Sequence, residues 1–206
     1  MKITSILDFI GQHESRNDLN RVWGGISKRH YPKKPLVTMT IGEVLAWQDS
    51  IDSLYRSEAA GAWQMLEDTL RGLYVEAGMQ LTDKFDADGQ ARLATALLRR
   101  RGLVAYMAGQ ITAEKFANAI AREWASMPVV SGPQKGRSYY AGDGLNKSGV
   151  SVDAFMAAVK AVKEFAPPGK PTDLQTPKAT PEACAPKRGW LATIIAAIVA
   201  FFRSKK

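Results

Sequence analysis

One glutamate stands where an apolar helical pattern ends near the N-terminus. Four residues recur at the three-and-four spacing of a buried helix stripe: Ile6, Phe9, Ile10 and His13. Glu14 follows Ile10 by four positions, so we expect it on or beside that apolar face. Residues 15–18 (SRND) are of types that favour caps and turns. The stretch 9–18 therefore predicts a carboxylate at a helix end, half turned towards an apolar interior.

A carboxyl group in that position is suited to general acid catalysis. Desolvation disfavours the charged form and raises the pKa of a carboxyl group, and a general acid that works near neutral pH needs such a raised pKa. These residues alone leave open the alternative that Glu14 faces solvent at an ordinary helix end. We interpret His13 as its neighbour on the helix and not as a catalytic base.

A second stretch with chemical potential is residues 59–64 (AAGAWQ). Gly61 lets backbone approach closely, Trp63 offers a flat apolar face, and Gln64 carries a donor and an acceptor. Aromatic platforms with amide hydrogen bonds suit pyranose rings. Taken alone, a G-x-x-Q string is more typical of an ordinary loop that enters a helix.

Mostly helical patterns must position these two stretches. Thr40 and Glu43 predict a capping box that opens a helix with Val44, Leu45, Gln48 and Ile51. Further helices are predicted over residues 65–77, 86–102, 112–126 and 151–165. Strand patterning is confined to residues 36–39. We therefore predict a mostly α fold of the α+β class, in which the strand region is minor.

The longest loop, residues 129–146, is glycine-rich and contains Tyr139 and Tyr140. Loops of this length in compact domains are functional or disordered, and two adjacent tyrosines argue against disorder. For both tyrosines, core packing and ligand contact remain open alternatives.

Composition bounds the class of protein. The chain of 206 residues, 46% hydrophobic and 23% charged, fits one domain with appendages. Its net charge of +8 is uneven, because residues 1–165 contribute +3 and residues 166–206 contribute +5. A basic tail suits an anionic surface. The sequence contains no basic stripe interleaved with aromatic residues, which argues against nucleic-acid binding.

Cysteine, metal and signal patterns exclude further classes. The single Cys184 rules out an internal disulfide framework. We expect no metal site and no cofactor, because no cluster of histidines, cysteines or carboxylates has ligand spacing. Asp8 interrupts the first apolar run, so we expect no N-terminal signal peptide.

Two segments follow the predicted domain. Residues 166–187 hold six of the ten prolines and predict a semi-rigid spacer. Residues 189–202 carry no charge and are flanked by cations, among them Lys187 and Arg203. A helix of that length covers about 21 Å, short of a bilayer core of about 30 Å, and snorkelling cations can close much of the gap. We expect a membrane-associated helix over residues 188–206, with an interfacial or partner-bound helix as the alternatives.

The order of these motifs resembles a known superfamily. An E-S pair ending the first helix, a later G-x-x-Q, and then W-A-S-M-P (residues 124–128) are similar to the lysozyme-like superfamily. Within it the strings ESRNDLNRVWGG, AAGAWQ, EWASMPVV and SYYAGDGLN resemble lambda-type phage endolysins and lytic transglycosylases. The resemblance covers roughly residues 5–160 and does not extend to the spacer or the apolar tail.

The resemblance implies cleavage of the β-1,4 bond between N-acetylmuramic acid and N-acetylglucosamine in peptidoglycan. Glu14 takes the family's catalytic position. A transglycosylase needs one acid, whereas a muramidase normally uses a second carboxylate, for which four residues are candidates: Asp18, Asp49, Asp52 and Glu58. The expected substrate-binding residues are Gln64, Trp63, Tyr139, Tyr140 and Asp18.

The predicted protein is thus a lysozyme-like domain (residues 1–165), a spacer (166–187) and an apolar helix (188–206). We expect a phage enzyme that acts on the glycan strand, either held at the host inner membrane for lysis or packaged in the virion for entry, with other lysis or virion proteins as possible partners. The alternative function is a non-catalytic, membrane-anchored glycan-binding module on the same fold.

Overall fold

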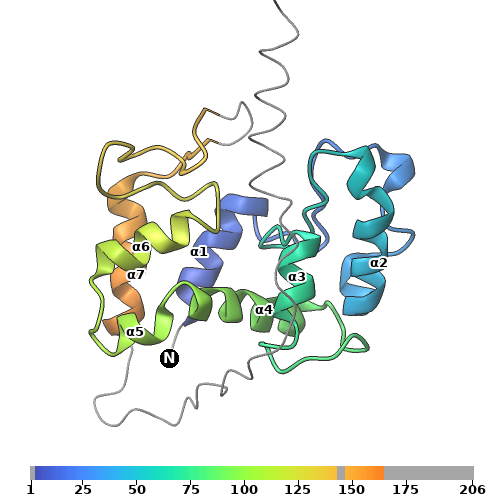
Figure 1. The fold of residues 1–206 in the computed structure, drawn as a ribbon, viewed down its shortest axis with the longest axis horizontal. Helices are drawn as coiled ribbons and strands as arrows, with labels where there is room; N and C mark the ends of the chain where they lie inside the picture. The colour runs from blue at the N-terminus through green and yellow to red at the C-terminus, as the bar shows by residue number, and fades with distance from the viewer. Residues whose placement is uncertain (1–2, 143–146, 165–206) are drawn as a thin grey trace, which may run out of the picture. The chain divides into compact units, whose positions relative to one another are not determined.

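The computed structural model describes residues 3–142 and 147–164, and within them seven α-helices and three short 3-10 helices (Figure 1). The α-helices are α1 (Ile3–Ser15), α2 (Ile41–Ile51), α3 (Glu67–Leu73), α4 (Ala87–Arg100), α5 (Leu103–Met107), α6 (Ala113–Ala121) and α7 (Val152–Glu164). The 3-10 helices are η1 (Lys28–His30), η2 (Leu36–Thr38) and η3 (Asp52–Leu54). The predicted spacer and apolar tail lie outside the described residues.

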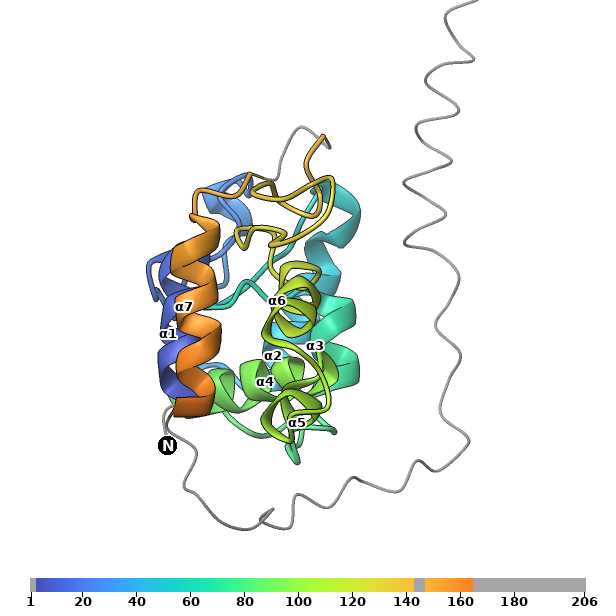
Figure 2. The ribbon, with the colours of Figure 1, turned by 90° about the vertical axis from the view of Figure 1, so that its left-hand side faces the viewer.

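Helix α1 is placed by helices from distant parts of the chain. It packs against α7 and α4, and Figures 1 and 2 show α1 and α7 side by side. Phe9 of α1 and Phe155 of α7 stack with ring centroids 6.3 Å apart. Ile6 and Ile10 are fully buried, as their spacing predicts, but His13 is exposed and packs edge-on against Phe9. The prediction that His13 belongs to the buried stripe was wrong, because the apolar contacts of α1 stop a turn earlier.

Helix α2 begins as predicted. The Thr40 side chain accepts from the Glu43 amide, and the Glu43 carboxylate accepts from the Thr40 amide, which completes the capping box. The predicted inward residues of this helix are all buried: Val44, Leu45, Gln48 and Ile51. Helix α2 packs on α3, and α3 packs on α4, so this pair is tied to the rest of the domain through α4.

The other predicted helices are present with different bounds. Helix α4 begins at an Asp86 cap and buries Leu93, Leu97 and Leu98. Gly102, in the left-handed region at φ 102°, separates α4 from α5, a helix that the sequence pattern did not predict. Helix α3 ends at Leu73 and α6 at Ala121, earlier than expected.

The predicted strand at residues 36–39 was wrong. Those residues form η2, because the Pro35 carbonyl accepts hydrogen bonds from both the amide and the hydroxyl of Thr38 and closes a tight turn. Among the described residues, β structure is limited to isolated bridges such as Val22–Ala60 and Ala60–Met65. The mostly helical fold class is confirmed. In residues 3–142 and 147–164 no helix is long and apolar enough to cross a bilayer.

Candidate active site

Glu14 occupies the last turn of α1 and is half-buried. Its neighbour Ser15 is buried, and the Ser15 hydroxyl donates to the Ala62 carbonyl (2.8 Å). Ser15 Oγ also accepts from the Asp18 amide (3.1 Å). The end of α1 is therefore fastened to the 59–64 stretch directly beside Glu14, so the structure brings together the two stretches that carry the predicted chemistry.

The Glu14 carboxyl group has a defined partner. Its Oε1 accepts from the Ser126 hydroxyl (2.5 Å) and from the Ser126 amide (3.2 Å). Burial raises the pKa of Glu14 above its ordinary value, and the two hydrogen bonds from Ser126 offset only part of that rise. The Glu14 carboxyl group is therefore half-buried at the end of α1, as the sequence pattern predicts, and burial raises its pKa. Ser126 lies in the W-A-S-M-P string, but its pairing with Glu14 joins residues too far apart for local patterns to show.

Backbone strain gathers around this carboxyl group. Among the described residues, the non-glycine residues with positive φ are Arg16 (62°), Asn17 (58°) and Gln64 (48°). Two of them form the turn directly after Glu14, and the third ends the G-x-x-Q string. Such conformations cost free energy and persist where surrounding contacts hold them, which is common at functional sites.

Two buried glutamines hold the 59–64 stretch. Gln48 Nε2 donates to the carbonyls of Glu58 (3.0 Å) and Met65 (2.8 Å), at the two ends of the stretch. Gln90 Oε1 accepts from the Ala62 amide (2.8 Å) at its centre. Both side chains are fully buried. The sequence pattern places Gln48 on the inward face of its helix and does not single out Gln90.

Gly61 satisfies a steric requirement at this point. Its φ is 78°, and a Cβ atom there would lie 2.4 Å from Gln90 Oε1 and 3.0 Å from Phe85. The close backbone approach predicted for Gly61 is therefore an approach to the domain's own core. Gln90 Nε2 donates to the carbonyls of Phe85 and Leu19 (both 2.9 Å), so the amide that contacts Gly61 is itself fixed.

Gln64 is half-buried, and its Nε2 donates to the Gly61 carbonyl (2.9 Å) and more weakly to the Arg21 carbonyl (3.4 Å). These two bonds fix the orientation of the Gln64 side chain within the 59–64 stretch. Trp63 is placed differently from the expectation, because it is 8% exposed and its indole N–H donates to the Leu7 carbonyl (3.0 Å). Its ring packs in the core and offers little surface on which a sugar could stack.

The two tyrosines of the long loop surround one arginine. The guanidinium of Arg122 lies 5.2 Å from the ring centroid of Tyr139, which is 41% exposed. The Tyr140 hydroxyl donates to the Arg122 carbonyl (2.7 Å). Tyr139 thus stays partly exposed, whereas Tyr140 fastens the loop to the end of α6. Asp18 is exposed and accepts from the Asn20 amide (2.9 Å), which shapes the turn after α1.

The candidate second carboxylates differ in their surroundings. Asp49 and Asp52, like Asp18, are exposed. Glu58 is buried, burial raises its pKa, and its Oε1 accepts from the Glu67 amide (3.0 Å) at the first turn of α3. Glu58 therefore has a structural contact that satisfies a free amide of a helix end. In the described part of the chain no group of histidines, cysteines and carboxylates could hold a metal ion.

Comparison with known proteins identifies the family. A family model described as Endolysin matches residues 12–147, which is 136 of the 206 residues and includes Glu14, Gln64 and Ser126. No curated protein and no solved structure shows a significant match to the chain. The match covers well over half of the chain and contains all the site residues predicted from the sequence. The chain belongs to the endolysin family and is a phage enzyme that degrades the peptidoglycan of the bacterial cell wall.

Proposed function

We propose that the enzyme cleaves the β-1,4 bond between N-acetylmuramic acid and N-acetylglucosamine, with Glu14 as the general acid. The observation that carries the proposal is the half-buried Glu14 carboxyl group with its pKa raised by burial. A carboxylic acid that keeps its proton towards neutral pH can donate it to the glycosidic oxygen as an oxocarbenium-like transition state develops.

The two carboxyl oxygens of Glu14 differ in their hydrogen bonds and therefore in their proposed roles. Both contacts from Ser126 fall on Oε1. The transferable proton of the neutral acid is then carried by Oε2. Proton donation leaves a carboxylate whose charge the two Ser126 donors stabilise, so the same pair of bonds supports the state that follows bond cleavage.

We propose the transglycosylase outcome for the second step. The 6-hydroxyl of the muramic acid attacks its own C1, the bond to the departing sugar breaks, and Glu14 takes the hydroxyl proton, so that a 1,6-anhydro sugar forms and the acid is restored. One carboxyl group suffices for this sequence. Two facts support it over hydrolysis: Glu58 is occupied by the Glu67 amide, and the aspartates considered as a second carboxylate are exposed.

Gln64 and Tyr139 are proposed as glycan-binding residues. The amide of Gln64 is oriented by the Gly61 carbonyl beside the end of α1, and the exposed ring of Tyr139 offers an apolar face. Asp18, in the turn after α1, and Tyr140, in the long loop, complete the proposed set. The core position of Trp63 favours a structural role for that residue.

The test uses Glu14→Gln, which preserves the size of the side chain and an acceptor for Ser126. Glu76→Gln is the matched control, because Glu76 is exposed and forms a surface pair with Arg100. Clearing of purified peptidoglycan is expected from wild type and control, and a loss of about 100-fold or more from Glu14→Gln. Mass spectrometry of the wild-type products should show anhydro ends; reducing ends would establish hydrolysis instead.

Binding of glycan without cleavage by the wild type would favour the alternative function, a glycan-binding module. Equal clearing by Glu14→Gln and wild type would contradict the role proposed for Glu14. The first outcome would contradict glycan cleavage by this protein, and the second would contradict only the role of Glu14 in it.

For the C-terminal segment, we propose that residues 188–206 associate with the membrane and that residues 166–187 act as the spacer. Support comes from the uncharged run 189–202 between basic flanks. Deletion of residues 188–206 should move the protein from the membrane fraction to the soluble fraction. Mass spectrometry of purified virions distinguishes an entry enzyme, which would be present in them, from a lysis enzyme held at the host inner membrane.

A further inference from the structure

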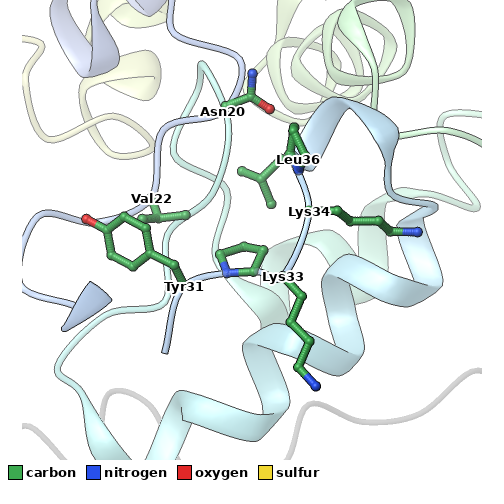
Figure 3. A pocket seen from close by; sticks show the side chains of 8 residues that line it. Asn20, Val22, Tyr31, Lys33, Lys34 and Leu36 are labelled. Carbon is green, nitrogen blue, oxygen red and sulfur yellow. The ribbon is translucent and has the colours of Figure 1, made fainter. Parts of the chain in front are cut away.

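The segment that joins α1 to α2 lines a surface hollow of about 250 Å³. The lining residues do not include Glu14. Figure 3 shows Val22, Leu36 and Tyr31 around the hollow, with Asn20 at one edge, while the side chains of Lys33 and Lys34 extend outward at the other. Val22 and Leu36 are buried, and Tyr31 is 41% exposed. The hollow thus combines an apolar floor, an aromatic wall and a cationic rim.

The charge around this hollow is one-sided. Residues 19–42 contain five lysines and arginines and no aspartate or glutamate, whereas the remainder of residues 1–165 contains 16 against 18. The positive excess of the domain is therefore concentrated here. Lys34 pairs with Glu43 (2.8 Å), but Lys28, Arg29 and Lys33 are exposed. These three take part in none of the ion pairs among the described residues.

The loop that carries these cations is held in place by hydrogen bonds to the side chains of Tyr55 and Trp47. The Tyr55 hydroxyl is 2.7 Å from His30 Nδ1 and accepts from the Ser27 amide (3.2 Å). The indole N–H of Trp47 donates to the His30 carbonyl (2.9 Å). Asn20 Oδ1 accepts from the Val37 amide (3.2 Å) across the hollow. A ligand would therefore meet a preformed surface and would pay little for ordering the loop.

The floor of the hollow is continuous with the glycan-binding stretch. Val22 forms a β-bridge with Ala60, and the Gly61 amide donates to the Arg21 carbonyl (2.8 Å). The same Arg21 carbonyl receives the weaker bond from Gln64. Residues 20–23 thus run beside the stretch that carries Gln64, which links the hollow to the proposed glycan-binding residues.

We propose that this hollow binds the acidic peptide branch of peptidoglycan, the stem peptide attached to the muramic acid. The inference rests on the proposed function and extends it to the part of the substrate that is not sugar. Lys33 at the rim, together with the exposed Arg29 of the same loop, attracts the free carboxylates of the peptide. The apolar floor with Tyr31 receives its aliphatic portions. The hollow would then favour glycan strands that still carry their peptides.

The test measures binding of the full chain in a Glu14→Gln background, so that the polymer is not consumed. The probes are sacculi free of covalently attached anionic polymers and the same glycan strands after an amidase has removed the peptides. The double variant Arg29→Gln/Lys33→Gln, called the rim variant below, removes one cation of the rim and one exposed cation of the same loop. The matched control Arg99→Gln/Lys160→Gln removes two exposed cations outside residues 19–42.

The expected result is that the background protein binds sacculi about fivefold more tightly than stripped strands, that Arg29→Gln/Lys33→Gln abolishes this difference, and that the control pair retains it. A preference that survives in the rim variant, equal loss on both probes, or an equal effect of the control pair would overturn the proposal. Failure of the parent enzyme to cleave either polymer would instead count against the proposed function.

Discussion

Ser126 donates two hydrogen bonds to one oxygen of Glu14, although 112 residues separate them in the chain. The contact connects the end of α1 to the segment that follows α6. Its effect on the pKa of Glu14 is opposite to that of burial, because hydrogen bonds to a carboxylate lower its pKa whereas desolvation raises it. The protonation of the proposed acid is therefore set by a balance between two effects that a single substitution can shift.

Replacement of Ser126 by alanine should move the pH dependence of cleavage. Loss of the hydroxyl donor removes one of the two effects that lower the pKa of Glu14, so this pKa rises and the acid keeps its proton to higher pH. The high-pH limb of the rate profile should shift upward, with a maximal rate lower by about tenfold, because the carboxylate formed after proton donation is less stabilised. Ser50→Ala, at an exposed hydroxyl, is the control. An unchanged limb would show that the hydroxyl does not tune Glu14.

Glu14→Gln should stabilise the fold at neutral pH. The pKa of Glu14 is higher in the folded than in the unfolded state, so the folded state binds more protons and the free energy of unfolding falls as pH rises through the folded-state pKa. Below the unfolded-state value near 4.5 the group is protonated in both states and the destabilisation is absent. Thermal unfolding should therefore give the variant a higher Tm at pH 7 and a smaller difference near pH 4. A constant difference at all pH values would contradict this linkage.

Gln90→Leu should destabilise the domain by about 3 kcal/mol or more. The substitution leaves the Ala62 amide and the carbonyls of Leu19 and Phe85 without their partner in a buried region, and each lost partner costs about 1 kcal/mol or more. Urea unfolding measures the change, with Gln110→Leu at an exposed position as control. Since the same bonds fix the 59–64 stretch, KM for peptidoglycan should rise as well. A decrease of less than about 1 kcal/mol in the free energy of unfolding would argue against a stabilising role for the three Gln90 hydrogen bonds.

Gly61→Ala and Gly109→Ala form a matched pair that separates two costs. Both glycines have positive φ, at 78° and 72°, but a Cβ at Gly61 meets Gln90 whereas one at Gly109 meets open space. Gly109→Ala should cost about 1 kcal/mol from backbone conformation alone. Gly61→Ala should cost at least about 1–3 kcal/mol more from steric overlap and should lower activity. Equal losses in urea unfolding would show that Gln90 yields to the added methyl group.

Where local chemistry dictates structure, the sequence was informative. The capping box of Thr40 and Glu43 and the Asp86-capped helix α4 follow from side chains three residues from the backbone groups they bind. The position of Glu14 at a helix end also followed from a local pattern. The predicted strand at residues 36–39 failed for the same kind of reason, because a side-chain bond from Thr38 to Pro35 outweighed the apolar run.

Tertiary structure alone decided which residues surround Glu14. The sequence determined a mostly helical domain with a carboxylate at the end of its first helix, because helical periodicity and capping act over three or four residues. Long-range packing determined that Ser126 binds Glu14, that Gln90 supports Gly61, and that the ring of Trp63 enters the core. These contacts join residues dozens of positions apart. They form only when the chain has folded, because polar groups that lose water on burial must then find partners within the protein.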